Sequence, residues 1–109
     1  VQQNVLAAVE GLAFGKRAGL DVEVLLQTLQ TGTADSKALR FQAARAMRGD
    51  FTPGFYPAHA LKDLEIAIEE SDALGMDLKG LKNMRDRWKA LFRIHPDAKS
   101  IQDIVRLYL

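Results

Sequence analysis

Hydrophobic side chains recur every three or four residues along most of this chain, which is the spacing of an amphipathic α-helix. Short segments rich in Gly, Thr, Asp or Pro interrupt the pattern and separate six predicted helices. Their spans are 3–18, 22–30, a helix capped by Asp35 or Ser36 that reaches about Arg48, 57–74, 79–93, and a last helix capped by Ser100. No alternating apolar and polar run typical of a strand occurs, so we predict an all-α fold.

The first predicted helix carries apolar residues around much of its circumference and should lie in the middle of the helical bundle. These residues are Val5, Leu6, Val9, Leu12, Ala13 and Phe14. Ala7, Gly11 and Gly15 form a ridge of small side chains that would let a second helix approach closely. Charged neighbours such as Glu10 and Arg17 favour packing in a soluble core or a subunit interface over a membrane dimer.

Several helix ends carry residues that favour those positions. Asp21 is an N-cap candidate, and Pro57 suits a first helical position because it lacks the N–H that would be unpaired there. Glycines follow the expected ends of three helices: Gly19, Gly49 and Gly75. The helix at 79–93 should bury Met84, Trp88 and Leu91 along one side, and Pro96 ends it.

The segment 50–66 stands out because an aromatic loop leads into a helix with a charged pair in its second turn. Pro53-Gly54 predicts a turn, and Leu61, Leu64 and Ile68 fall on one face of the helix that follows. Lys62 and Asp63 project from its sides. A lysine so close to a helix N-terminus opposes the macrodipole unless an anion lies nearby. Lys62 is therefore either a site residue or the solvated partner of Asp63.

The run Asp50-Phe-Thr-Pro-Gly-Phe55, the Lys62-Asp-Leu triplet, Ala67 and the Ala73-Leu-Gly75 helix end resemble the C-terminal helical domain of the β-hydroxyacid dehydrogenases. That family includes 3-hydroxyisobutyrate dehydrogenase and tartronate semialdehyde reductase, and it is related to 6-phosphogluconate dehydrogenase. The resemblance extends from Asn4 to about Leu91. It implies that residues 1–109 form a single helical C-terminal domain and that an NAD(P)-binding Rossmann domain lies upstream.

The resemblance also implies a role for Asn4. Members of the family carry a catalytic lysine at the start of the long first helix and an asparagine one turn later on the same face. Asn4 matches the asparagine, so the lysine would lie one residue before Val1. Two side chains four residues apart project together, which lets one exchange a proton with the substrate while the other binds it. From the residues alone, an asparagine at this position is more often a cap or a surface residue than a catalytic one.

Three further site residues are implied in the same way. Lys62 would reach the cofactor ribose or nicotinamide, or the carboxylate of a bound hydroxyacid. Phe55 would form an apolar wall beside the nicotinamide, with a loop anchor packed on the bundle as its alternative. Ser36 lies in a segment that resembles the family loop bordering the substrate pocket, where several members carry an aromatic in place of Lys37. We expect Asn4 and Lys62 to converge on one solvent-reachable hollow.

Composition narrows the classes of function. The formal net charge of +1 supplies no general field for nucleic acid or an anionic membrane, and no uncharged stretch is long enough to span a membrane. The chain has no cysteine, which excludes thiol chemistry and suits a reducing cytoplasm. His59 and His95 lack metal-ligand spacing, so we expect no metal site. The start at Val1, without methionine or a signal-like run, is typical of a piece of a longer protein.

Two functions remain open at this stage. The first is the substrate-cleft and dimerisation domain of an NAD- or NADP-dependent dehydrogenase, which passes hydride between nicotinamide and a short hydroxyacid and assembles as a homo-oligomer. The second is a helical interaction or dimerisation module without catalysis. No G-x-G-x-x-G motif occurs in these residues, so we expect negligible dinucleotide binding and no activity from them alone.

Overall fold

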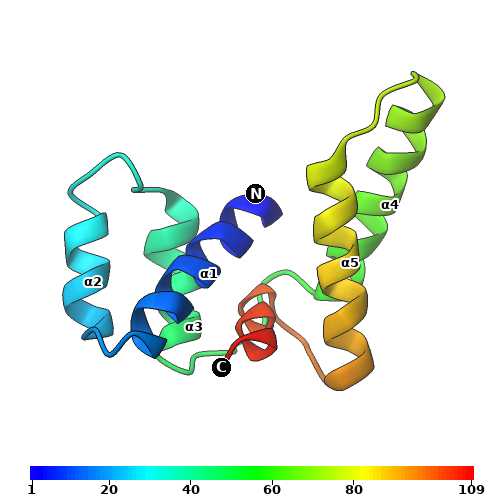
Figure 1. Ribbon diagram of the computed structural model, residues 1–109. Coiled ribbons are helices and arrows are strands. Elements are labelled where there is room, and N and C mark those ends of the chain that lie inside the picture. Colours follow the sequence, from blue (N-terminus) through cyan, green and yellow to red (C-terminus); the bar gives the residue numbers. More distant parts are fainter.

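The computed structural model describes all 109 residues and contains helices but no strand, which confirms the all-α prediction (Figure 1). Two of its helical segments, residues 38–43 and 44–47, follow each other without a break, so the chain forms the six predicted helices. In chain order the segments are α1 (Gln2–Arg17), α2 (Val22–Leu29), η1 (Ala38–Ala43), α3 (Ala44–Met47), α4 (Pro57–Ala73), α5 (Lys79–Ile94) and η2 (Ile101–Leu107).

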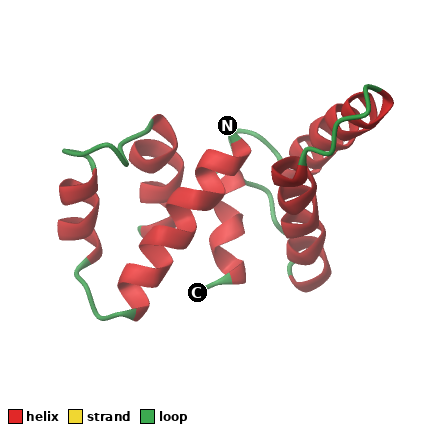
Figure 2. Cartoon of the chain, turned by 45° about the horizontal axis from the view of Figure 1, so that its top comes forward, coloured by secondary structure: helices red, strands yellow, loops and turns green.

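Helix α1 runs through the middle of the molecule, as predicted. It packs against α2, η1 and α3 on one side and against α5 and η2 on the other. Helices α4 and α5 form an antiparallel hairpin that makes up one end of an elongated molecule of 44 × 32 × 23 Å, with α2 at the opposite end (Figure 2). The N-terminus of α1 therefore lies where the hairpin meets the rest of the bundle.

The hydrophobic core is continuous from α1 to α5 and η2. Val5, Val9 and Leu12 of α1 are fully buried, and Trp88 and Leu91 of α5 are buried with them, as predicted. Phe14 corrects the prediction, because its side chain is 76% exposed. Position 14 lies on the one face of α1 that the surrounding helices leave open.

Of the three small residues on the α1 ridge, Ala7, Gly11 and Gly15, only Gly15 packs closely against another helix. Gly15 is buried, and a methyl group there would overlap the side chain of Leu25, so its small size lets α2 approach α1 closely. No heavy atom lies within 4 Å of the place where a Gly11 side chain would begin. Ala7 is also exposed. The ridge therefore packs against α2 at one end and borders open space at the other.

Two predicted helices differ from α-geometry. Ser36 caps the third helix, since its hydroxyl accepts a hydrogen bond from the Leu39 N–H at 3.0 Å, but the first turns after it are π-helical. The last helix is a 3-10 helix, and Ser100 and Asp103 form a reciprocal capping box at its start. Side-chain periodicity does not separate these closely related helix types in short segments, so the sequence predicted the helices but not their hydrogen-bond pattern.

Candidate functional site

A groove of about 490 Å³ runs along the open face of α1, and we name it the Asn4 groove. Asn4, Ala7 and Gly11 form its α1 wall. The segment from Thr33 to Ser36 forms the opposite wall, with Leu29 and Leu39 completing an apolar floor. The structure therefore brings together two of the four predicted site residues, Asn4 and Ser36.

Asn4 lines this groove, and its side chain has no hydrogen-bond partner of its own in the chain. The N-cap of α1 is Val1, so Asn4 is not a cap, and its exposed side chain takes part in no hydrogen bond within the chain. A free amide offers two N–H donors and one carbonyl acceptor. It is suited to hold a hydroxyl or carboxylate of a small ligand, and it cannot serve as an acid or base because it does not titrate.

The opposite wall of the Asn4 groove is fixed by local hydrogen bonds. The Ser36 oxygen already accepts from Leu39, which leaves its O–H free to donate into the groove. The neighbouring Asp35 carboxylate accepts two hydrogen bonds from Arg40, at 2.8 and 2.9 Å. This side-chain hydrogen bonding holds the pKa of Asp35 below its ordinary value, so Asp35 is a paired anion rather than a free base.

A second hollow of about 420 Å³ lies between the first turn of α1 and the α4–α5 hairpin, and we name it the Phe55 hollow. Its walls include Gln3, Phe55 and Asp63, with Leu64 and Leu81 as apolar surface. The Phe55 ring is 45% exposed, so it is not an anchor buried in the bundle. A partly open aromatic ring beside amide groups forms a surface suited to a flat heteroaromatic ring.

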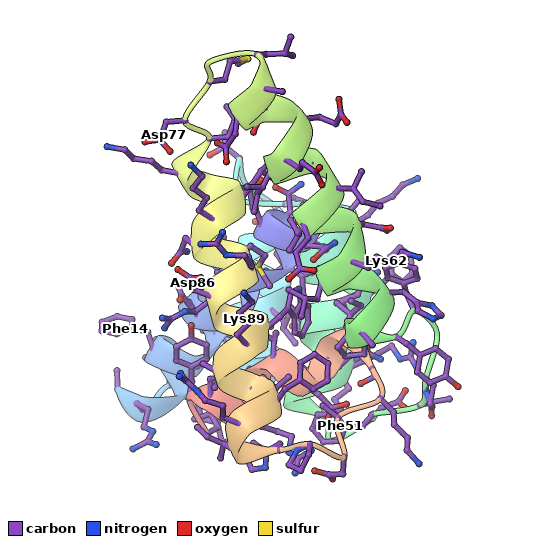
Figure 3. The ribbon with its side chains drawn as sticks, turned by 90° about the vertical axis from the view of Figure 1, so that its right-hand side faces the viewer. Phe14, Phe51, Lys62, Asp77, Asp86 and Lys89 are labelled. Carbon is purple, nitrogen blue, oxygen red and sulfur yellow. The ribbon has the colours of Figure 1, made fainter.

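Lys62 lies on the exposed side of α4 that faces away from α5 (Figure 3). It forms no ion pair with Asp63 or with any other residue of the chain. It lines neither the Asn4 groove nor the Phe55 hollow. Within this chain the structure does not bring Lys62 and Asn4 to a common hollow, so their convergence stays a prediction.

Gln2 joins the elements that carry these residues, and no pattern in the sequence predicted this role. Its Nε2 donates to the Ala60 carbonyl at 3.1 Å, and its Oε1 accepts from the indole N–H of Trp88 at 2.7 Å. Trp88 is fully buried, and a buried indole N–H needs a partner. Trp88 was therefore the one available signal, but its partner lies 86 positions away in the chain and could not be identified from spacing.

A third hollow, of about 660 Å³, lies at the other end of α1 and contains none of the predicted site residues. Arg106 dominates its charge. The guanidinium donates to Asp97 and Asp103 at 3.2 and 3.1 Å and to the ring Nδ1 of His95 at 2.8 Å. These groups partly neutralise one another and tie the end of α5, where His95 is the C-cap, to η2.

The charged faces of the α4–α5 hairpin partly neutralise each other. Lys82 of α5 contacts Asp72 of α4 at 3.1 Å, and Lys89 lies 3.8 Å from Glu65. Exposed pairs of this kind contribute little stability, on the order of 0–1 kcal/mol each. Both helices of the hairpin, like the others in the structure, fall short of the length and apolar character that a membrane-crossing helix requires.

Comparison with known proteins places this geometry in a family. A family model described as NAD-binding of NADP-dependent 3-hydroxyisobutyrate dehydrogenase matches residues 1–108. A probable 3-hydroxyisobutyrate dehydrogenase-like protein of Arabidopsis thaliana is 41% identical over 81 residues, which cover 74% of this chain and 24% of that protein. The 2-hydroxy-3-oxopropionate reductase of Escherichia coli is 36% identical over 78 residues, 72% of this chain and 27% of the reductase.

A solved structure shares the fold. The crystal structure of a 3-hydroxyisobutyrate dehydrogenase from Salmonella typhimurium superposes with a TM-score of 0.90 at 18% identity, covering 98% of this chain and 38% of that one. The chain thus spans well under half the length of the relatives it matches. The remainder of those relatives has no counterpart in these 109 residues.

Proposed function

The chain belongs to the 3-hydroxyisobutyrate dehydrogenase family of β-hydroxyacid dehydrogenases, and from that premise we propose that it is the helical C-terminal domain of an NAD(P)-dependent enzyme of this kind. The complete enzyme would oxidise a short hydroxyacid or reduce the corresponding carbonyl compound. The observation that carries the proposal is the Asn4 groove, which is lined by Asn4 on the first turns of α1 and by Ser36 on the opposite wall. The two groups together suit a small oxygen-rich substrate.

The residues of this chain would bind and orient the substrate rather than titrate. The Asn4 amide would hold the substrate hydroxyl or carboxylate, and the Ser36 O–H would donate a second hydrogen bond. Lys62 carries a free cation on α4 that is available to a substrate carboxylate or to the cofactor. The family resemblance assigns the proton transfer to a lysine preceding Val1, from which Asn4 would lie one helical turn away.

The Phe55 hollow fits the flat end of a nicotinamide cofactor. Phe55, Leu64 and Leu81 supply apolar surface, and the side chains of Gln3 and Gln42 supply amide groups at its edge. The dinucleotide, when bound, supplies the hydride acceptor or donor, and an upstream Rossmann domain would hold most of it. Phe55 would keep water from one face of the ring, and Lys62 would lie near the ribose or the nicotinamide amide.

We further propose that the protein is a cytoplasmic homo-oligomer. The support for a homo-oligomer is the Phe14 ring of α1, which is exposed and does not line the Asn4 groove. An exposed apolar surface on a helix that is otherwise part of the core is typical of a contact surface. The same observation favours the second candidate function, a helical interaction module without catalysis, so the two functions must be separated by experiment.

The deciding experiment measures hydride transfer in the full-length protein, with NADH and NADPH followed by absorbance against a panel of short hydroxyacids and their carbonyl forms. We expect turnover with at least one acid. Asn4→Ala and Lys62→Ala should each lower kcat/KM roughly tenfold to a hundredfold, the effect of removing a hydrogen bond to a charged group. Lys16→Ala, an exposed lysine at the other end of α1, is the matched control and should leave the kinetics unchanged.

The outcomes separate the hypotheses. Absence of turnover with every acid and both cofactors would reject the dehydrogenase and leave the interaction module. Turnover that is insensitive to Lys62→Ala and Asn4→Ala would keep the enzyme but reject these residues as its binding groups. Circular dichroism of each variant should match the wild type, because both side chains are exposed and lie outside the core.

A further inference from the structure

We propose that Gln2 is a positioning residue, which fixes the first turn of α1 against α4 and thereby sets where the Asn4 amide lies relative to Lys62. The kinetic effect expected of this role rests on the proposed dehydrogenase function. The structural effect, a fixed separation of α1 and α4, does not depend on that function. Gln2 lies two positions before Asn4, and its bonding partner Ala60 lies two positions before Lys62.

Both the oxygen and the nitrogen of the Gln2 amide are hydrogen-bonded within the chain. The Trp88 indole N–H can only donate, and the Ala60 carbonyl can only accept. Gln2 accepts from the first at 2.7 Å and donates to the second at 3.1 Å. Turning the amide over would place a donor against a donor and an acceptor against an acceptor, so the two partners select one orientation of the Gln2 side chain.

The bridge matters because α4 has few other ties to α1. Helix α4 packs on α5, whereas α1 packs on α2, η1, α3, α5 and η2. The Gln2 side chain extends from α1 to the backbone carbonyl of Ala60 in the first turns of α4, and Ala60 is fully buried. Apart from apolar packing in the shared core, the bridge is the side-chain hydrogen bond that places α4 directly against the first turn of α1.

A second feature holds the first turn of α1 against the hairpin. A methyl group at Gly80, in the first turn of α5, would overlap the end of the Gln3 side chain. The absence of a side chain at Gly80 therefore leaves room for Gln3 to lie against α5. Gln2 and Gln3 together anchor the start of α1 to both helices of the hairpin, and Gln2 is the one that reaches α4.

The first test measures geometry without activity. Nitroxide labels at Ala7→Cys and Glu69→Cys, both exposed, report the distance between α1 and α4 by pulsed electron resonance in full-length protein freed of other cysteines and diluted with unlabelled chains. Gln2→Leu should shift or broaden the distance distribution. Gln102→Leu is the matched control, because Gln102 is buried and its hydrogen bonds go to the backbone carbonyls of Asp50 and Thr52, not to α1 or α4.

Gln2→Glu distinguishes two roles for Gln2: linking α4 to α1, and only accepting the hydrogen bond of the Trp88 indole. A carboxylate still accepts from the indole N–H but cannot donate to the Ala60 carbonyl. The proposal expects Gln2→Glu to alter the distance distribution as Gln2→Leu does. A wild-type distribution in Gln2→Glu would overturn it, because the residue would then serve only to pair the buried indole.

The second test is kinetic. In full-length enzyme, Gln2→Leu should lower kcat roughly tenfold with KM changed less than about twofold, since small misplacement of a binding group costs rate rather than ground-state affinity. Gln102→Leu should lower thermal stability without this change in kcat. Unchanged distances and unchanged kcat in Gln2→Leu would overturn the proposal. Wild-type protein without hydride transfer would overturn the dehydrogenase function instead, and the distance distributions would still decide the role of Gln2.

Discussion

At the scale of single residues, Asp50 shows how one side chain organises the loop that leads to Phe55. Its carboxylate accepts from the Arg45 guanidinium at 2.8 and 3.3 Å and from the Thr52 N–H at 3.0 Å. Arg45 also donates to the Thr52 carbonyl at 3.2 Å. The Arg45 hydrogen bonds, followed by those from Thr52, hold the pKa of Asp50 well below its ordinary value of 3.8.

This network predicts an acid-dependent contribution to stability. A carboxyl group whose pKa is lowered by folding stabilises the folded state above its unfolded pKa, and that stabilisation is lost as the pH falls toward the folded pKa. Asp50→Asn should therefore lower the melting temperature by a constant amount above about pH 5, and the difference from wild type should shrink below pH 3.8. Thermal unfolding followed by circular dichroism between pH 3 and 7 measures it.

The control is a double-mutant cycle with Arg45→Met, which should remove most of the effect of Asp50→Asn if the ion pair is its cause. A difference between Asp50→Asn and wild type that stays constant down to pH 3 would contradict the linkage. In that case the loss would come from the shape of the loop rather than from the charge of the carboxylate.

At the scale of helices, the sequence predicted what depends on local spacing and missed what depends on distant contacts. Asp21 caps α2 through the Val24 N–H, and Pro57 occupies the first turn of α4, as predicted, because caps and proline act on their own helix. Phe14 lies three residues after Gly11 and seven after Ala7, so helical spacing alone places it on their exposed face rather than with the core residues of α1.

The candidate site shows the same difference between residues placed by local sequence patterns and residues placed by distant contacts. The sequence named Asn4 and Ser36, and the fold places them on opposite walls of one groove. It did not reveal Gln2, because a glutamine that bridges Ala60 and Trp88 has no local pattern of its own. It also did not predict the π-helical turns after Ser36, which shape one wall of the groove.

Two glycines of α1 give a matched test of helix packing. Gly11→Ala should stabilise the protein by up to about 1 kcal/mol, since alanine favours the helix and no atom lies within 4 Å of the added methyl group. Gly15→Ala should gain nothing or destabilise, because the methyl group would overlap Leu25 and overpacking costs about 1–3 kcal/mol. Urea unfolding of both variants measures the difference. Equal stabilisation by the two substitutions would show that α2 is not packed closely on Gly15.

At the scale of the whole molecule, two of the most exposed apolar side chains, Leu74 at 77% and Phe14 at 76%, lie on different helices. Leu74 and Met76 lie at the tip of the α4–α5 hairpin, and Phe14 lies on the open face of α1 beyond the Asn4 groove. Figure 3 shows Phe14 on the opposite side of the molecule from Lys62. A contact surface around Phe14 would therefore leave Lys62 accessible to ligands.

The proposed homo-oligomer predicts a role for Phe14 in the contact between subunits. Phe14→Ser should weaken self-association of the full-length protein, because it removes an apolar ring that is 76% exposed. Sedimentation velocity over a range of concentrations measures the change. Ile66→Ser, which alters an exposed apolar residue on α4, is the control and should leave the assembly intact. If Phe14→Ser leaves the oligomer unchanged but lowers the melting temperature, the ring is covered by another part of the same polypeptide, and the open face of α1 is a domain interface rather than a subunit interface.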